Sequence, residues 1–347
     1  VYKRQQQINA FAAPGGIIGI NAGLLALSGR EDELASVIAH EIAHLSQRHF
    51  AQQQSSAEKR APLVLAGMLG GILLSGINPN AGAAALHGTL GASASARLAF
   101  SRQNELDADQ AGMNTLVAAG FDPQAMPRMF MLLQNVNQFS GGNLPEFLRT
   151  HPVTQSRIAD STNRAAQISN GAFEPDDPDS YILAKVRAQI HFGLPKNAPE
   201  TSKESKIFDF YRAVADRDSK RANQAWAALP EAIQFHPWAE LGFAELSLAL
   251  NQQNEAKDRI DELYALYPDD RAIQRATADI WMKTGALSAS VQLYRDLIRD
   301  TPTDPQLWYQ LAEIYGLLDD KPQLNRARIE FFLLKGNIDL ALRQVEF

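Results

Sequence analysis

The feature that most constrains this chain is a helix-forming stretch with two histidines, residues 32–45. It contains no Gly or Pro, and apolar residues recur at helical spacing, at positions 34, 38, 42 and 45. We expect a helix whose apolar stripe faces the protein core. His40 and His44 are four positions apart, so they share one helix face, roughly opposite that stripe.

These histidines belong to the pattern His40-Glu41-Ile42-Ala43-His44. Two imidazoles on one face can bind a single zinc ion, with each nitrogen about 2.0 Å from it. Glu41 projects beside such an ion, where its carboxylate can take a proton from water. The pattern favours a zinc peptidase over a helix that carries these residues by chance, and a third ligand distinguishes the two.

Residues 97–117 form a second helical pattern, and we expect the third ligand there. Glu105 can supply it and leave the fourth position to water, as catalytic zinc requires. Asp109 is one turn further along the same face and can accept the free ring N–H of a ligating histidine. The alternative for Glu105 is a solvated carboxylate on a helix surface.

His151 precedes Pro152, which favours an extended conformation, so we expect its imidazole on a loop. There it can stabilise the oxyanion of the tetrahedral intermediate, or it can occupy the fourth zinc position and keep the enzyme inactive. The remaining alternative is a histidine on a surface loop. Arg157 can pair with a site carboxylate or be a plain surface residue. The other histidines are interpreted as structural: His49, His87, His191 and His236.

Two further segments flank these motifs. Residues 8–11 and 17–20 are short apolar runs around Pro14-Gly15-Gly16, which predicts a hairpin or small sheet. Such a strand can accept a peptide substrate as a further strand, or it is buried and only packs. Residues 61–96 contain no Asp, Glu, Lys or Arg. They are interpreted as core helices, as a hairpin at a membrane interface, or as a span, although the first apolar part is short of the roughly 20 residues needed.

The second half of the chain has a repeating pattern. Residues 171–182 are rich in Pro and Asp and indicate a linker between domains 1–170 and 183–347. Pro268 and Pro302 are about 34 residues apart, one tetratricopeptide period. We expect three to four degenerate repeats, with Ser290 where Ala is usual. Stacked helix pairs leave a concave face suited to another protein; the alternative is an extension that only stabilises the peptidase.

Composition sets the remaining limits. A chain of 347 residues exceeds the usual size of one core, so two domains are expected. The net charge of −6 argues against nucleic acid as a partner, and the absence of Cys excludes disulfides and Cys chemistry. Because the chain begins at Val1 with a polar stretch, we expect any signal peptide to lie upstream.

Four motifs carry a resemblance to a known family. They are Asn9-Ala10-Phe11-Ala12-Ala13-Pro14-Gly15-Gly16, Gly23-Leu24-Leu25, the His40–His44 pattern and Glu105-Leu106-Asp107-Ala108-Asp109. In this order and spacing, the first half of the chain resembles the M48 family of zinc metallopeptidases. The resemblance implies that His40, His44 and Glu105 bind zinc, with Glu41 as general base and Asp109 holding a ligand.

The sequence therefore predicts a mainly α fold, in which a zinc peptidase domain with a small hairpin precedes a helical repeat domain. With the second half included, the resemblance is to a periplasmic member of the family. It implies misassembled outer-membrane proteins as substrates and the β-barrel assembly machinery as partner. The competing classes are a chaperone-like scaffold with a mostly closed zinc site and a cytosolic enzyme sharing only the peptidase domain.

Overall fold

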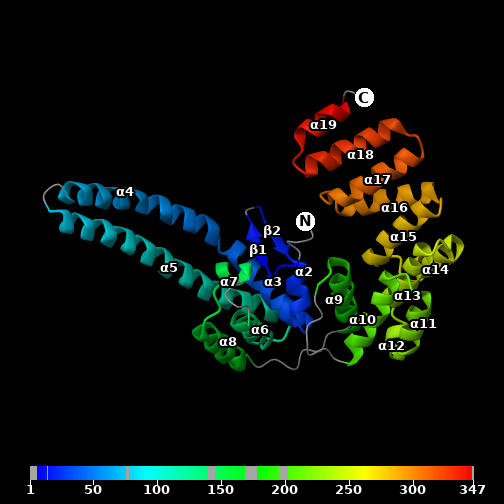
Figure 1. Ribbon diagram of the computed structural model, residues 1–347, viewed down its shortest axis with the longest axis horizontal. Coiled ribbons are helices and arrows are strands. Elements are labelled where there is room, and N and C mark those ends of the chain that lie inside the picture. Colours follow the sequence, from blue (N-terminus) through cyan, green and yellow to red (C-terminus); the bar gives the residue numbers. More distant parts are fainter. Residues whose placement is uncertain are drawn as a thin grey trace. The chain divides into compact units, whose positions relative to one another are not determined.

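The computed structural model describes residues 6–13, 15–75, 78–139, 145–168, 178–194 and 202–345. Contacts divide the chain into two compact units. The first runs to Tyr181 and also includes the segment that begins at His191, and the second contains Ile182–Ile190 and the later helices. The described residues are mainly helical with one two-stranded sheet, which confirms the predicted fold class (Figure 1). Of the predicted linker, residues 171–177 lie outside the described part, and residues 178–182 begin a helix.

The first unit opens with an antiparallel hairpin, β1 (Ala10–Ala13) and β2 (Ile17–Ile20), in which Ala10 pairs with Ile20. The predicted first strand, 8–11, is thus two residues early, and Pro14 of the expected turn lies outside the described residues. Only Ala10 is fully buried, whereas the side chains of Phe11 and Ile17 are exposed. The pair is therefore not a buried packing strand, and pairing with a substrate strand stays a prediction.

Helix α3 (Glu31–Ser46) carries the histidine pattern, and its orientation differs from the prediction. Its buried face holds His40, Glu41 and small residues, whereas Ile42 of the predicted stripe is 37% exposed. The reason is close helix packing. Ala39 packs with Leu116 and Ala125 on neighbouring helices, so a small side chain faces the core at this contact. Leu34 packs against the core and Ile38 and Leu45 are half-buried, so the predicted apolar stripe faces the core only in part.

Two long helices follow, α4 (His49–Ser75) and α5 (Pro79–Ala118). They run side by side as a hairpin that projects from the rest of the first unit (Figure 1). Between them, a Cβ added at Gly71 would lie 2.7 Å from Leu86 Cγ, so the close approach requires glycine. Within α4 only His49 and Gly71 are buried, so the interpretation of residues 61–96 as core helices was wrong. Among the described residues, no helix has the length and apolar character of a membrane span.

Smaller elements complete the first unit. They are α2 (Ala22–Leu27), α6 (Ala125–Phe139), α7 (Glu146–Thr150) and α8 (Gln155–Gln167). A buried ion pair joins the first turn of α3 to α6. Asp32 of α3 is fully buried and accepts a hydrogen bond from Nη2 of Arg128 on α6 at 2.7 Å. Arg128 also binds Asp122 at 2.8 Å. The acidic first turn of α3 therefore has a packing role in addition to complementing the helix dipole.

The later helices are α9 (Pro178–Phe192), α10 (Ser202–Ala215), α11 (Ser219–Ala227), α12 (Glu231–Gln234), α13 (Pro237–Ala249), α14 (Gln253–Leu266), α15 (Arg271–Lys283), α16 (Leu287–Asp300), α17 (Pro305–Leu317), α18 (Lys321–Leu334) and α19 (Ile338–Val345). Helices α13, α15 and α17 begin 34 residues apart, and so do α11, α14, α16 and α18. Packed helix pairs at this period are the geometry of tetratricopeptide repeats.

Ser290 occupies a tight position in these repeats. Its side chain is fully buried, and its Oγ donates to the carbonyl oxygen of Ala278 at 2.7 Å. A small residue is therefore required there, and Ser meets the requirement because its hydroxyl has a partner.

Candidate metal centre

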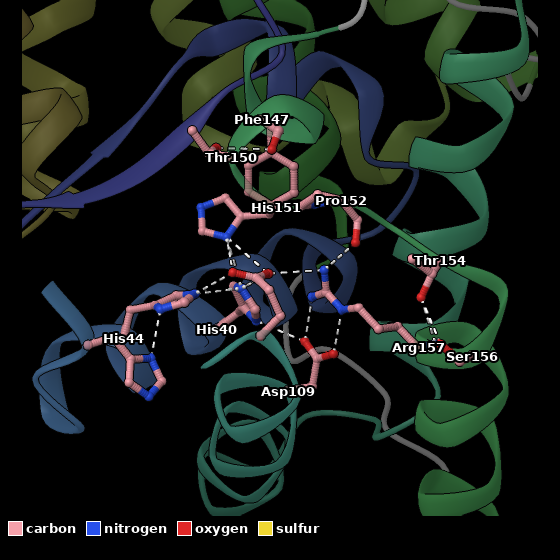
Figure 2. Close-up of polar contacts among 12 residues, drawn as sticks. His40, His44, Asp109, Phe147, Thr150, His151, Pro152, Thr154, Ser156 and Arg157 are labelled. Carbon is pink, nitrogen blue, oxygen red and sulfur yellow. Dashed lines mark hydrogen bonds and ion pairs between the residues drawn. The ribbon is translucent and has the colours of Figure 1, made fainter. Parts of the chain in front are cut away.

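Four side chains from three parts of the first unit converge on one point. They are His40 and His44 from α3, Glu105 from α5 and His151, which follows α7; their donor atoms all lie within 4.8 Å of one another. Nε2 of His40 is 3.0 Å from Nε2 of His44 and 3.4 Å from Glu105 Oε2. His44 Nε2 is 3.4 Å from Glu105 Oε1. Figure 2 shows the two α3 imidazoles and His151 directed at this point.

The approach of α5 to α3 depends on Gly112. A Cβ at this position would lie 3.0 Å from His40 Cα and 3.1 Å from His40 N, in contact with backbone. Because Gly112 lacks that atom, α5 can lie against the turn of α3 that carries His40. Glu105 and Asp109 precede Gly112 on α5, so the same contact brings both carboxylates to the cluster.

Asp109 and Arg157 brace the site from behind. Oδ1 of Asp109 is 3.0 Å from His40 Nδ1, the ring nitrogen that points away from the cluster. Arg157 on α8 binds Asp109 with two nitrogens and is 5% exposed, so it is not the plain surface residue of the alternative interpretation. Its Nη1 also lies 3.0 Å from Glu105 Oε2 and donates to the Pro152 carbonyl oxygen at 2.8 Å. One guanidinium thus joins both carboxylates to the segment after His151 (Figure 2).

His49 makes a contact that the sequence interpretation missed. It is buried, and its Nδ1 lies 2.9 Å from Nδ1 of His44. When the His44 N–H donates in this bond, Nε2 of His44 keeps a lone pair for a cation. The only sequence signal was the third histidine within ten residues. A break between α3 and α4, where Arg48 has a φ of 57°, hid the relationship.

Glu41 lies beside the cluster with an unusual carboxylate. The residue is 1% exposed, and its Oε1 is buried without a hydrogen-bond partner in the described part of the chain. His151 Nε2 lies 3.5 Å from that oxygen. Buried carboxylate oxygens are normally satisfied, so an orphaned one requires an explanation such as a catalytic role or a bound water.

His151 takes a place within the cluster. It caps the short α7 with a φ of −124°, outside helical geometry, as expected from Pro152. Its Nδ1 lies 3.1 Å from Glu105 Oε1 and 3.3 Å from His40 Nε2. The ring also packs at 4.9 Å from that of Phe147, which fixes its orientation (Figure 2).

The electrostatics of the cluster suit a cation. Burial alone would lower the pKa of His40, but the carboxylates of Asp109 and Glu105 outweigh it and raise the pKa to about 9. Burial opposes ionisation of Glu105, yet its contacts with His151, His40 and His44 hold its pKa well below the usual range. Burial lowers the pKa of His44, which keeps this imidazole neutral.

The donor chemistry fits a metal ion. Imidazole nitrogen and carboxylate oxygen suit zinc and other first-row transition metals, and ligating histidines usually donate their second N–H to a carboxylate. The structure therefore brings together all six residues singled out in the sequence: His40, Glu41, His44, Glu105, Asp109 and His151. A helix-borne histidine pair, an adjacent buried glutamate and a carboxylate from a second helix are the features of a metallopeptidase.

Comparison with known proteins gives the same class. The family model "Peptidase family M48" matches residues 1–165. The chain is 31% identical over 349 residues to the β-barrel assembly-enhancing protease of Escherichia coli K12, covering 97% of this chain and 71% of that protein. This chain belongs to peptidase family M48.

Other relatives extend the comparison. A putative β-barrel assembly-enhancing protease of Vibrio cholerae is 29% identical, over 98% of this chain and 72% of its own. The mitochondrial metalloendopeptidase OMA1 of Saccharomyces cerevisiae is 32% identical, over 50% of this chain and 47% of its own. A tetratricopeptide repeat protein from Parabacteroides merdae covers 70% of this chain and 93% of its own at 13% identity and a TM-score of 0.38, so the helix period and not this overlap identifies the repeats.

Proposed function

We propose that this chain is a zinc endopeptidase in which His40, His44 and Glu105 bind the metal. The proposal is supported by the convergence of their donor atoms and by the negative surroundings of His40. When bound, zinc polarises the scissile carbonyl and makes water more acidic. Asp109 Oδ1 lies 3.0 Å from His40 Nδ1, where it can accept the N–H of this nitrogen and direct His40 Nε2 at the ion.

Glu41 is the proposed general base. Its free carboxylate oxygen takes a proton from the attacking water and then passes it to the leaving amine. The supporting observation is the burial of Oε1 without a hydrogen-bond partner among the described residues. With no hydrogen bond to Oε1 in the described structure, this oxygen is available to a water beside the cluster, and His151 Nε2 lies 3.5 Å from it.

The single observation that carries the assignment is the placement of Glu41 beside a buried cluster of histidine and glutamate donors. Its test is the Glu41→Gln variant, with Glu58→Gln on the exposed side of α4 as a matched control. We expect Glu41→Gln to keep its zinc and to lose peptide cleavage by at least a thousandfold, and Glu58→Gln to cleave normally. An unchanged rate for Glu41→Gln rules out this mechanism.

The proposed substrates are misassembled outer-membrane proteins, and the proposed compartment is the periplasm. Support comes from similarity to proteases named for β-barrel assembly across 97% of the chain. The repeats are proposed to bind the β-barrel assembly machinery, since stacked helix pairs offer an extended protein-binding face. A bacterium whose own relative of this protein is replaced by the Glu41→Gln variant tests both activities, degradation and β-barrel assembly. Retained assembly with lost degradation of a stalled β-barrel protein is the expected result, and retained degradation contradicts it.

A second candidate is a chaperone-like scaffold with a mostly closed metal site. The observation that favours it is the position of His151 Nδ1, 3.1 Å from Glu105 Oε1 and 3.3 Å from His40 Nε2, where it can serve as fourth ligand. The alternative role for His151 is oxyanion stabilisation. His151→Ala separates these roles: faster cleavage indicates a closing ligand, and slower cleavage indicates an oxyanion donor.

A further inference from the structure

The α4–α5 hairpin exposes large apolar side chains along its projecting part. Within the described part of residues 61–96, the exposed large apolar side chains are Leu63, Leu65, Met68, Leu69, Ile72, Leu73, Leu74 and Leu90. Leu63 and Leu73 are the most open, at 73% and 74% exposed. Soluble proteins rarely leave a contiguous apolar surface of this kind uncovered unless it binds something.

These side chains surround α4 and do not form one stripe. At about 100° per residue, Leu63 and Leu65 project from nearly opposite sides of the helix. The remaining side is occupied by α5, where Gly71 meets Leu86. A protein partner would cover one face, whereas lipid chains can cover every outward side at once.

The distribution of charge marks a boundary across the hairpin. Residues 61–96 contain no Asp, Glu, Lys or Arg, and the residues that precede them at the base of α4 are basic, Lys59 and Arg60. Lys59 and Arg60 thus end the apolar surface of α4 at its base, as expected where a surface meets anionic headgroups.

We propose that the α4–α5 hairpin docks onto an anionic lipid surface. The outward apolar side chains of α4 enter the interface, and Lys59 and Arg60 face the lipid phosphates. The charge-free part of α4 rises about 22 Å, less than the roughly 30 Å of a hydrocarbon core, and polar Asn78 and Asn80 lie near the tip. The charge-free part of the hairpin is therefore too short to cross the whole hydrocarbon core. Because α4 begins at His49, docking holds the metal centre close to the membrane surface.

Vesicle flotation of the full 347-residue chain tests the apolar contribution. The chain should float with vesicles containing about one third phosphatidylglycerol, and the triple variant Leu69→Glu, Ile72→Glu, Leu73→Glu should bind them at least about tenfold more weakly. The matched control introduces the same charges at exposed apolar positions of the repeats: Leu266→Glu, Leu317→Glu and Ile338→Glu. The control should float as the parent does, and all variants should cleave a short soluble peptide equally.

A second variant tests the basic boundary. Lys59→Gln with Arg60→Gln should weaken binding to anionic vesicles about tenfold and leave binding to phosphatidylcholine vesicles unchanged. The proposal is overturned if the parent chain stays unbound with every vesicle, or if the repeat control loses as much binding as the hairpin variant. The proposal is also overturned if the hairpin variant keeps its vesicle binding but no longer binds a denatured β-barrel protein. That result assigns the surface to a protein partner.

Discussion

Arg157 grips Asp109 through both carboxylate oxygens, with its Nε 2.7 Å from Oδ2 and its Nη2 2.7 Å from Oδ1. The pair is buried and links α8 to α5 behind the histidine cluster. The remaining nitrogen, Nη1, reaches Glu105 and the Pro152 carbonyl. The metal centre therefore depends on the Arg157 guanidinium. In the described structure, Arg157 makes no hydrogen bond or ion pair with the histidines of the cluster.

Replacing Arg157 tests that dependence. In Arg157→Gln, Asp109 loses its bidentate partner and no longer holds His40 in place, so zinc affinity should fall about 10- to 100-fold. Arg157→Lys should recover only part of it, because an ammonium cannot reproduce the planar contact. Competition with a chelator measures the affinities. Arg164→Gln, on the exposed side of the same helix, is the control and should bind zinc normally. Normal affinity in Arg157→Gln would refute the bracing role.

A second test concerns His49. In His49→Phe, His44 loses the ring partner at 2.9 Å that sets which nitrogen carries its proton, so zinc affinity should fall about tenfold. Nitrogen chemical shifts of His44 should also show a mixture of tautomers. His87→Phe on the exposed part of α5 should change neither quantity. If the two variants behave alike, His49 has only a packing role.

The sequence predicted the site more fully than it predicted the packing around it. Spacing of four placed His40 and His44 together, and an acid one turn after Glu105 predicted Asp109 behind them. The orientation of α3 was predicted only in part, because its buried face also uses Ala39 and Ala43, which do not belong to the stripe of large apolar residues. His49 was missed because its contact crosses a helix break, and no local period connects the two sides.

The repeats and the hairpin show the same limit. The 34-residue period was visible in Pro268 and Pro302, whereas the short helix α12 between α11 and α13 has no counterpart in that period. For residues 61–96 the absence of charge was evident, yet burial and exposure both suit such a composition. Only the placement of the helices distinguishes a core from a projecting hairpin, and this depends on contacts far apart in the sequence.

Gly112→Ala tests the close contact of α5 with α3. The added methyl would meet the His40 backbone at 3.0–3.1 Å, and the overpacking should cost about 1–3 kcal/mol. The alanine gains about 1 kcal/mol of helix propensity, so a net loss of up to about 2 kcal/mol in the free energy of unfolding is expected. Zinc affinity should fall as well, because Glu105 moves from His40. Gly88→Ala, where a Cβ meets open space, should be neutral or stabilising. A stabilised Gly112→Ala with full zinc affinity would contradict the packing.

Arg128 offers a test by stability and pH. Arg128→Met leaves Asp32 buried without this cation, and the free energy of unfolding should fall by about 1–3 kcal/mol, less than for a fully buried pair because Arg128 is partly exposed. Burial opposes ionisation of Asp122, but the Arg128 hydrogen bond lowers its pKa. The stabilisation is therefore present above the unfolded pKa of about 4 and is lost as pH falls through the lower folded pKa.

The variant should accordingly lose part of this acid dependence. Urea unfolding between pH 3 and 7 measures it, with Arg299→Met at an exposed surface pair as the control. Identical pH profiles for Arg128→Met and the parent would show that the Asp122 contact contributes nothing to stability.

The central claim is that His40, His44 and Glu105 share one zinc ion beside Glu41. Anomalous diffraction recorded on both sides of the zinc absorption edge, from crystals of active protein, tests it most directly. The account predicts a single zinc peak about 2.0–2.2 Å from His40 Nε2, His44 Nε2 and a Glu105 oxygen. A protein that cleaves peptides with no zinc signal at this cluster, or with its zinc bound elsewhere, would contradict it.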